Sequence, residues 1–238
     1  MDNQSPPPER RSFFTRLNAG AASLAALAIG GIALAQDKST DKSTDKSTTR
    51  WEPARHDQDD WLEKPSKHRL IFDTTTPDDL GDALAFAANY IRVNRSDYGL
   101  QNNDLAVVIV VRHRSVTFGY SDAIWAKYGA TLAAQSKFED PKSKAAPKAN
   151  VFNATDYGNL LPNRGVTFES LAKQGVQLAV CSVATRGVAG VIAEAVGGSA
   201  DAINKELIAS IGSYARMVPA GIVAVNRAQE RGYSLTGA

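Results

Sequence analysis

Side chains that can do chemistry follow three apolar segments of this sequence, each at the point where the segment ends. In chain order they are Asp73, Arg112 with His113, and Cys181. If the segments are neighbouring parallel strands, their carboxyl ends lie along one edge of a sheet, which is where open α/β sheets bind their ligands. The pattern therefore predicts a site at that edge, built from a carboxylate, a guanidinium, an imidazole and a thiol.

Cys181 is the single cysteine of the chain, which excludes an intrachain disulfide. We expect a helix to start near residues 185–187, so that a thiolate at the end of the preceding strand would face the helix's positive end and the guanidinium of Arg186. The same residue also continues the apolar run 178–180, and free cysteines are among the most buried residues. Residue identity alone favours an inert core thiol, so both interpretations stay open.

His113 lies between Arg112 and Arg114, which makes it a candidate proton donor or anion contact; the simpler interpretation is a solvated loop histidine. A cysteine-nucleophile hydrolase would require His113 and Asp73 to converge on the thiol in space. The sequence contains no H-x-H, H-E-x-x-H or C-x-x-C motif, so we expect no metal site. It also lacks a dinucleotide fingerprint, a P-loop and a G-x-S-x-G elbow, and we expect no cofactor.

The elements that would position these groups alternate between strands and helices. The unbroken, β-branched run within 104–111 is typical of a strand buried on both faces of a parallel sheet. We expect strands over 68–73, 104–111, 176–181, 215–218 and 233–235. We expect helices over 77–94, 120–128, 167–174, 188–196, 199–211 and 221–231, and a loop over 135–150. The alternation predicts one domain, 68–238, with an open, mostly parallel α/β sheet.

The first 35 residues have the organisation of an export signal. Arg10 and Arg11 precede two aromatic residues, and an apolar stretch over 19–35 ends in the sequence Ala-Leu-Ala. A basic start, an apolar centre and an A-x-A end are typical of a removable signal peptide, and paired arginines indicate the twin-arginine route. We therefore expect a periplasmic mature protein. An uncleaved membrane anchor is the alternative, because the apolar stretch is near the lower limit for spanning a bilayer.

Residues 36–67 should connect this signal to the domain. Three tandem Asp-Lys-Ser-Thr repeats over 37–48 contain no apolar residue and predict a flexible spacer. Residues 50–67 predict an extended arm whose Trp51 and Trp61 dock on the domain. The net charge of +2 gives no electrostatic reason to expect a nucleic-acid partner, and we expect no membrane partner after signal removal.

Several segments resemble the DsrE/DsrF-like proteins. Residues 175–181 (GVQLAVC) followed by 186–188 (RGV) resemble the family's cysteine strand, and 219–233 (PAGIVAVNRAQERGY) is similar to its last helix and strand. Residues 110–113 (VVRH) and 118–128 (FGYSDAIWAKY) look like exported members. The resemblance covers residues 68 to the C-terminus. It implies a five-stranded parallel sheet with helices on both faces, as in flavodoxin-like three-layer folds, and frequent oligomerisation.

In the sulfur-relay members of this family a cysteine carries persulfide sulfur, and the matching residue here is Cys181. Two features depart from those members: Arg186 follows the cysteine more closely, and those proteins are cytoplasmic. The expected function is a periplasmic sulfur carrier or thiol-redox protein. Arg186, Arg112, His113 and Asp73 would be its binding residues, and a small sulfur compound or a partner thiol protein its partner. The alternative is a non-catalytic small-ligand-binding or oligomeric assembly module with a structural cysteine.

Overall fold

The computed structural model describes residues 51–237, so the expected signal peptide and the repeats over 37–48 lie outside the described residues. The strands are β1 (His68–Thr74), β2 (Leu105–Val111), β3 (Gln177–Cys181), β4 (Ala215–Val218) and β5 (Ser234–Gly237). The α-helices are α1 (Pro77–Tyr98), α2 (Asp122–Ser136), α3 (Phe168–Ala172), α4 (Ser182–Val196), α5 (Ala200–Ala209) and α6 (Gly221–Gln229). The 3-10 helices are η1 (Asp57–Leu62), η2 (Asn102–Asp104), η3 (His113–Gly119), η4 (Val151–Asn153) and η5 (Gly158–Leu160).

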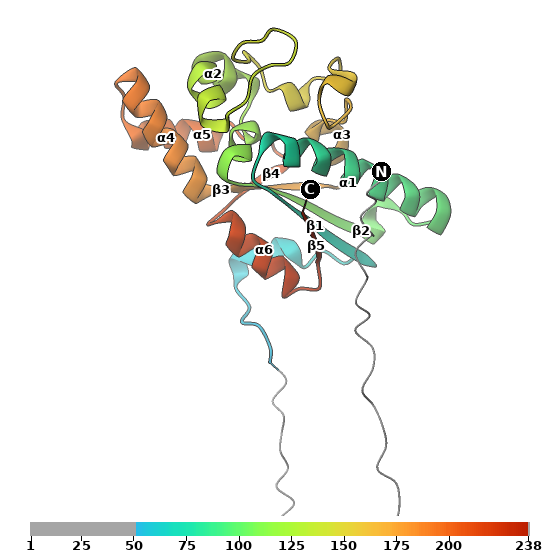
Figure 1. Ribbon diagram of the computed structural model, residues 1–238. Helices are drawn as coiled ribbons and strands as arrows, with labels where there is room; N and C mark the ends of the chain where they lie inside the picture. Colours follow the sequence, from blue (N-terminus) through green and yellow to red (C-terminus); the bar gives the residue numbers. More distant parts are fainter. Residues whose placement is uncertain (1–50, 238) are drawn as a thin grey trace, which may run out of the picture. The chain divides into compact units, whose positions relative to one another are not determined.

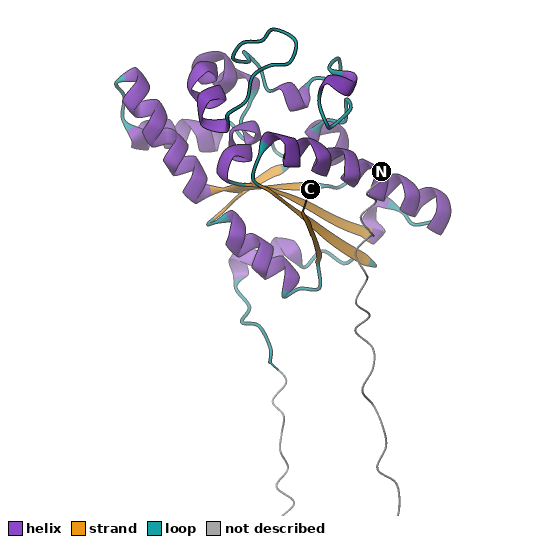
Figure 2. Ribbon diagram, in the orientation of Figure 1, coloured by secondary structure: helices purple, strands orange, loops and turns teal. Residues whose placement is uncertain are grey.

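The five strands form one open sheet in the order β4-β3-β2-β1-β5, and every pair in it is parallel. This confirms the predicted α/β fold class. Figure 1 shows α1 and α2 over one face of the sheet and α6 on the other, and Figure 2 shows the strands between these helical layers. Each of the seven residues of β2 is buried, because this central strand is covered on both faces.

Alternate residues of the strands enter two separate cores, as the two-residue period of a strand requires. Phe72, Ile109 and Val180 belong to the larger core, beneath α1, α2 and α4. Val110 and Ala179 belong to the smaller core, which packs against α6. The ladder pairs Val111 of β2 with Val180 of β3, so the residues that follow these two strands emerge at one level of the sheet edge.

Of the helix boundaries that differ from expectation, two affect this edge. Helix α4 begins at Ser182 rather than near residues 185–188, because Cys181 itself caps the helix through its sulfur. Helix α2 continues to Ser136, so Gln135 is helical and not part of a loop. A third element, η3, follows β2 directly and had no counterpart among the expected elements.

The segment expected as an extended arm contains the helix η1. Its Leu62 is completely buried in the smaller core, and Arg216 lies over the ring of the half-buried Trp61 at 5.6 Å. Trp51, in contrast, is 72% exposed. The arm therefore packs on the domain through Leu62 and Trp61.

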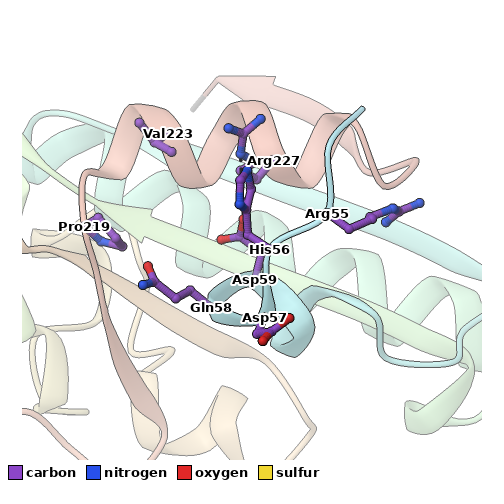
Figure 3. A pocket seen from close by; sticks show the side chains of 8 residues that line it. All are labelled: Arg55, His56, Asp57, Gln58, Asp59, Pro219, Val223 and Arg227. Carbon is purple, nitrogen blue, oxygen red and sulfur yellow. Dashed lines mark ion pairs between the residues drawn. The ribbon is translucent and has the colours of Figure 1, made fainter. Parts of the chain in front are cut away.

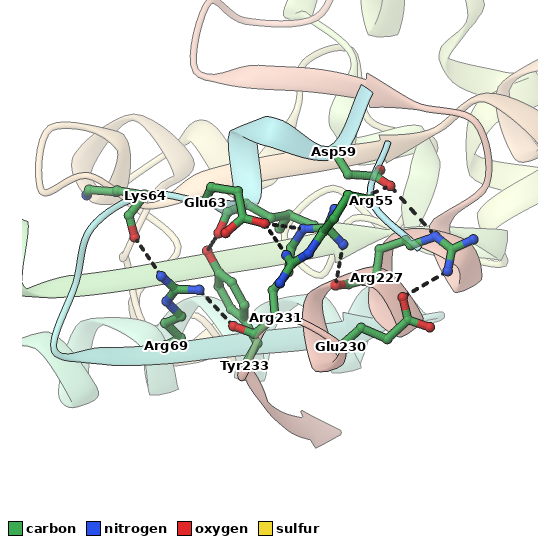
Figure 4. A network of polar contacts seen from close by, with 10 residues as sticks. Arg55, Asp59, Glu63, Lys64, Arg69, Arg227, Glu230, Arg231 and Tyr233 are labelled. Carbon is green, nitrogen blue, oxygen red and sulfur yellow. Dashed lines mark hydrogen bonds and ion pairs between the residues drawn. The ribbon is translucent and has the colours of Figure 1, made fainter. Parts of the chain in front are cut away.

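Polar contacts hold the end of this arm against the C-terminal part of the chain (Figure 4). The buried Arg231 donates from Nε to Glu63 at 2.9 Å, and the hydroxyl of Tyr233 donates to the carbonyl of Leu62 at 3.1 Å. Arg69 donates to the carbonyl of Arg231 at 2.7 Å. Within residues 51–237, no helix is both long and apolar enough to cross a membrane.

Candidate functional site

A cavity of about 380 Å³ lies at the carboxyl edge of the sheet, between the first turns of α4 and α6. Its chemically active lining residues are Arg112, His113, Arg114 and Cys181. Three of these were predicted, from strand ends far apart in the sequence, and the parallel sheet brings them together. The remaining wall is mainly apolar and includes Val183, Val188 and Ile222.

Cys181 is the last residue of β3 and the N-cap of α4. Its sulfur accepts a hydrogen bond from the backbone N–H of Ala184 at 3.4 Å. Its carbonyl accepts from the hydroxyl of Thr185 at 2.9 Å, and that hydroxyl accepts from Tyr120 at 3.0 Å. Burial raises the pKa of Tyr120, which therefore stays protonated. These contacts fix the thiol at the positive end of α4, where a negative charge on sulfur is favoured.

Access to this thiol is limited, since Cys181 is only 6% exposed. The residue is thus buried in the larger core and also borders the cavity. Its burial agrees with an inert core thiol, and its position at the cavity agrees with a thiol that can react. The cavity is the route by which a small reagent or ligand can approach the sulfur.

Asp73 and Arg112 form an ion pair beside the thiol. Arg112 donates from Nε and Nη2 to the two carboxylate oxygens, each at 2.7 Å. The hydrogen bonds with Asp73 raise the pKa of Arg112. A bidentate pair of this kind balances most of the charge of the guanidinium. Asp73 consequently acts on the site through Arg112 rather than by lining the cavity.

The turn after β2 presents His113 at the cavity with a left-handed backbone, φ = +54°. This conformation is uncommon for a residue with a side chain. It is held by Ser115, whose hydroxyl accepts from the N–H of Arg112 at 3.1 Å and donates to the carbonyl of Thr74 at 2.9 Å. Among the described residues, the His113 ring has no hydrogen bond to Cys181 or Asp73. The structure therefore does not assemble the histidine–acid pair that the hydrolase hypothesis requires.

The structure places Arg186 outside the cavity. This residue is exposed on α4 and donates to the hydroxyl of Ser182 at 2.8 Å, one turn earlier in the same helix. Because α4 begins at Ser182, Arg186 lies in its second turn and not at the helix start where it was expected beside the thiol.

Two lining residues, Arg114 and Gln135, were absent from the predicted site. Arg114 could have been included, because it belongs to the same turn as Arg112 and His113. Gln135 could not, because the sequence predicts a loop over 135–150, whereas the structure has this residue in the last turn of α2.

Helix α6 closes the other side of the cavity. Its N-cap, Ala220, offers no side-chain acceptor to the first backbone N–H groups of the helix. Gly221 allows this helix end to approach Arg112 closely, since a Cβ atom at this position would lie 2.8 Å from Cβ of Arg112. The cavity therefore receives the positive ends of two helices, α4 and α6.

A larger cavity of about 510 Å³ lies between the arm and α6 (Figure 3). Arg227 in its wall is paired with Asp59 at 3.7 Å and with Glu230 at 2.8 Å. The charge of Arg227 is thus balanced within the protein, and the lining of this cavity contains no thiol. Size alone does not make it the better candidate. Residues 51–237 contain no group of three or more His, Cys, Asp or Glu side chains placed to hold a metal ion.

No family model, curated protein or solved structure matches this chain significantly. The functional assignment therefore depends on the geometry of the cavity and on the chemistry of the residues around it.

Proposed function

We propose that the protein is an exported, DsrE-like thiol protein in which Cys181 carries sulfane sulfur as a persulfide or acts as a redox-responsive thiol. The observation that supports this proposal is the position of the sulfur. It caps α4 and also borders a cavity of about 380 Å³ lined by two arginines and a histidine. A helix N-terminus and nearby cations stabilise both a thiolate and the anionic outer sulfur of a persulfide.

Sulfur loading requires a donor that contains a sulfane sulfur, such as a thiosulfonate. The thiolate of Cys181 attacks the outer sulfur of the donor, and the donor's sulfur–sulfur bond breaks. The electron pair of that bond leaves with the sulfinate, or with sulfite when the donor is thiosulfate, and Cys181 keeps the transferred sulfur as a persulfide anion. The total charge is unchanged, and the positive surroundings favour both the attacking and the product anion.

Mass spectrometry of the native protein after incubation with thiosulfate tests this role. We expect a mass increase of about 32 Da on Cys181, reversed by dithiothreitol. The Cys181→Ser protein should show no increase. A mass increase that persists in Cys181→Ser, or none in the native protein, would contradict the carrier function.

Thiol accessibility gives an independent test, because Cys181 is 6% exposed. We expect the native thiol to react with iodoacetate faster, relative to iodoacetamide, than a free cysteine does, since the cavity's cations attract the charged reagent. A thiol that reacts only after denaturation would instead support the second candidate function. That candidate is a non-catalytic small-ligand-binding or oligomeric assembly module, and the burial of Cys181 in the larger core favours it.

Export is the part of the proposal that depends on sequence alone. The paired arginines Arg10 and Arg11 should direct the precursor to the twin-arginine route. Replacing both with lysine should leave the precursor in the cytoplasm, detected by cell fractionation and blotting. Unchanged export would contradict this route.

A further inference from the structure

Arg114 differs from the other buried or half-buried arginines of the described chain. Arg112 and Arg231 are paired with carboxylates, as is Arg227. Arg69 donates to two backbone carbonyls. Within residues 51–237, the half-buried side chain of Arg114 has no carboxylate within ion-pair distance, and its buried Nε has no hydrogen-bond partner.

An unpaired, partly buried guanidinium is unfavourable for folding, because its charge loses water without gaining a counter-charge. Arg114 lines the same cavity as Cys181, so a ligand in the cavity can supply the counter-charge of the guanidinium, although the buried Nε itself is closed to solvent. Asp73, the acid that pairs with Arg112 of the same turn, already accepts from Arg112 at both of its oxygens. A bound anion would therefore balance a charge that the described part of the protein leaves unbalanced.

The rest of the cavity fits the same kind of ligand. The first turns of α4 and α6 border it through Val183 and Ile222, and helix N-termini favour negative groups. These two residues are 54% and 57% exposed, and their side chains give the cavity an apolar rim. A volume of about 380 Å³ is suited to a small molecule.

We propose that this cavity binds a small organic oxyanion, with Arg114 as the anchor of its charged group and Val183 and Ile222 in contact with its apolar body. The proposal goes beyond the thiol function, because the binding residues do not include the sulfur. It holds equally for a sulfonate and for a carboxylate, which share the oxyanion chemistry that a guanidinium recognises.

Calorimetric titration of the mature protein tests this inference with three probes: butanesulfonate, butyrate and the uncharged butanesulfonamide. We expect at least one of the two anions to bind about tenfold or more tightly than the sulfonamide, because charge-assisted hydrogen bonds to Arg114 are lost with the neutral probe. The relative affinity of the two anions distinguishes a sulfonate site from a carboxylate site. Failure of both anions to bind, or equal binding of the sulfonamide, would overturn the proposal.

Variants assign the binding to Arg114. Arg114→Gln should weaken anion binding about tenfold or more, and Arg114→Lys should weaken it less. Arg186→Gln is the matched control, because this exposed arginine lies outside the cavity, and it should leave the affinity unchanged. Equal affinities of the wild-type and Arg114→Gln proteins would contradict the assignment.

The stability of Arg114→Gln separates a binding role from a structural one. If Arg114 is held for a ligand, its replacement should leave the melting temperature of the unliganded protein unchanged or raise it, because an unbalanced charge is removed. A large decrease would show that Arg114 stabilises the fold itself. Cys181→Ser should bind the anion normally while losing persulfide loading, so the failure of one proposal is distinguishable from the failure of the other.

Discussion

Asp73 and Arg112 meet across β1 and β2 with both carboxylate oxygens engaged at 2.7 Å, although they are 39 positions apart in the chain. This pair gives the two arginines at the cavity different roles. Arg112 is balanced within the protein, whereas Arg114 has no carboxylate partner among residues 51–237.

The pair can be tested by replacing Asp73 with Asn. This change leaves a half-buried guanidinium without its counter-charge and should lower the free energy of unfolding by about 1–3 kcal/mol, measured by urea denaturation. Glu169→Gln, which breaks the exposed pair with Lys173 on α3, is the matched control and should change stability little. A double-mutant cycle with Arg112→Gln should give a coupling energy clearly above zero, and additive effects would show that the pair contributes nothing.

The capping role of Cys181 predicts different effects for two substitutions of this residue. Serine is a preferred N-cap and can replace the sulfur as acceptor of the Ala184 N–H, so Cys181→Ser should melt within a few degrees of the wild type. Cys181→Ala removes the cap and should be less stable than the serine variant by about 0.5–2 kcal/mol. Equal stability of the two variants would show that the sulfur does not act as a cap.

Much of the site could be predicted because parallel strands impose a simple geometry. The apolar run of β2 is recognisable in the sequence, and the residues at its end and at the end of β3 must emerge at the same edge of the sheet. Residues Arg112, His113 and Cys181 were placed together by this rule alone, and the structure has them in one cavity.

What the sequence could not predict depends on contacts between distant residues. The turn that holds His113 is fixed by two hydrogen bonds between Ser115 and Thr74, which are 41 positions apart: the Thr74 hydroxyl donates to Ser115, and the Ser115 hydroxyl donates to the Thr74 carbonyl. The sulfur of Cys181 caps α4, so the helix starts at Ser182, earlier than the sequence predicts. Arg186 therefore lies in the second turn of the helix instead of at its start beside the thiol. The sequence also cannot show that Arg112 rather than Arg114 pairs with Asp73, which leaves Arg114 without a carboxylate partner in the described residues.

The close approach of α6 to Arg112 predicts that Gly221→Ala is harmful. The added methyl group would lie 2.8 Å from Cβ of Arg112 and 3.0 Å from Cγ1 of Val110, so the helix start must move away from the cavity. We expect a loss of about 1–3 kcal/mol in unfolding free energy and altered reactivity of Cys181 toward iodoacetate. Gly190→Ala is the control: this glycine has open space in α4, and the change should stabilise the protein by about 0.5–1 kcal/mol. Equal effects of the two substitutions would contradict the proposed packing.

The start of α1 predicts a pH-dependent contribution to stability. Thr76 accepts from the N–H of Asp79, and the Asp79 carboxylate accepts from the N–H of Thr76 and the hydroxyl of Thr75. Burial alone would raise the pKa of Asp79, but these hydrogen bonds lower it below its ordinary value of 3.8. A lowered pKa in the folded state means that the contribution is complete above the ordinary value and is lost as the pH falls below it.

Asp79→Asn should therefore destabilise the protein at pH 7, by about 0.5–2 kcal/mol for a lost cap, and the difference from wild type should shrink as the pH falls below 3.8. Chemical denaturation at pH 7, 4 and 3 measures this difference. Asp78→Asn is the control in the same helical turn, since its side chain makes no hydrogen bond in the described chain, and it should have a smaller effect. A difference that is constant with pH would contradict the role of the carboxylate.

Leu62 predicts that the arm is part of the folded unit, although the sequence alone placed the start of the domain near residue 68. Its side chain is 0% exposed and packs in the smaller core with Ala228 and Tyr233. Leu62→Ala should leave a cavity beneath the sheet and lower the free energy of unfolding by about 2–5 kcal/mol in urea denaturation. Trp51→Ala, which changes a residue 72% exposed in the same segment, is the matched control and should alter stability by less than about 0.5 kcal/mol.

Limited proteolysis should then cut Leu62→Ala within residues 51–67 faster than it cuts the Trp51→Ala control, because the arm loses its buried contact. If Leu62→Ala unfolds at the same urea concentration as the wild type, the arm does not contribute to the folded unit.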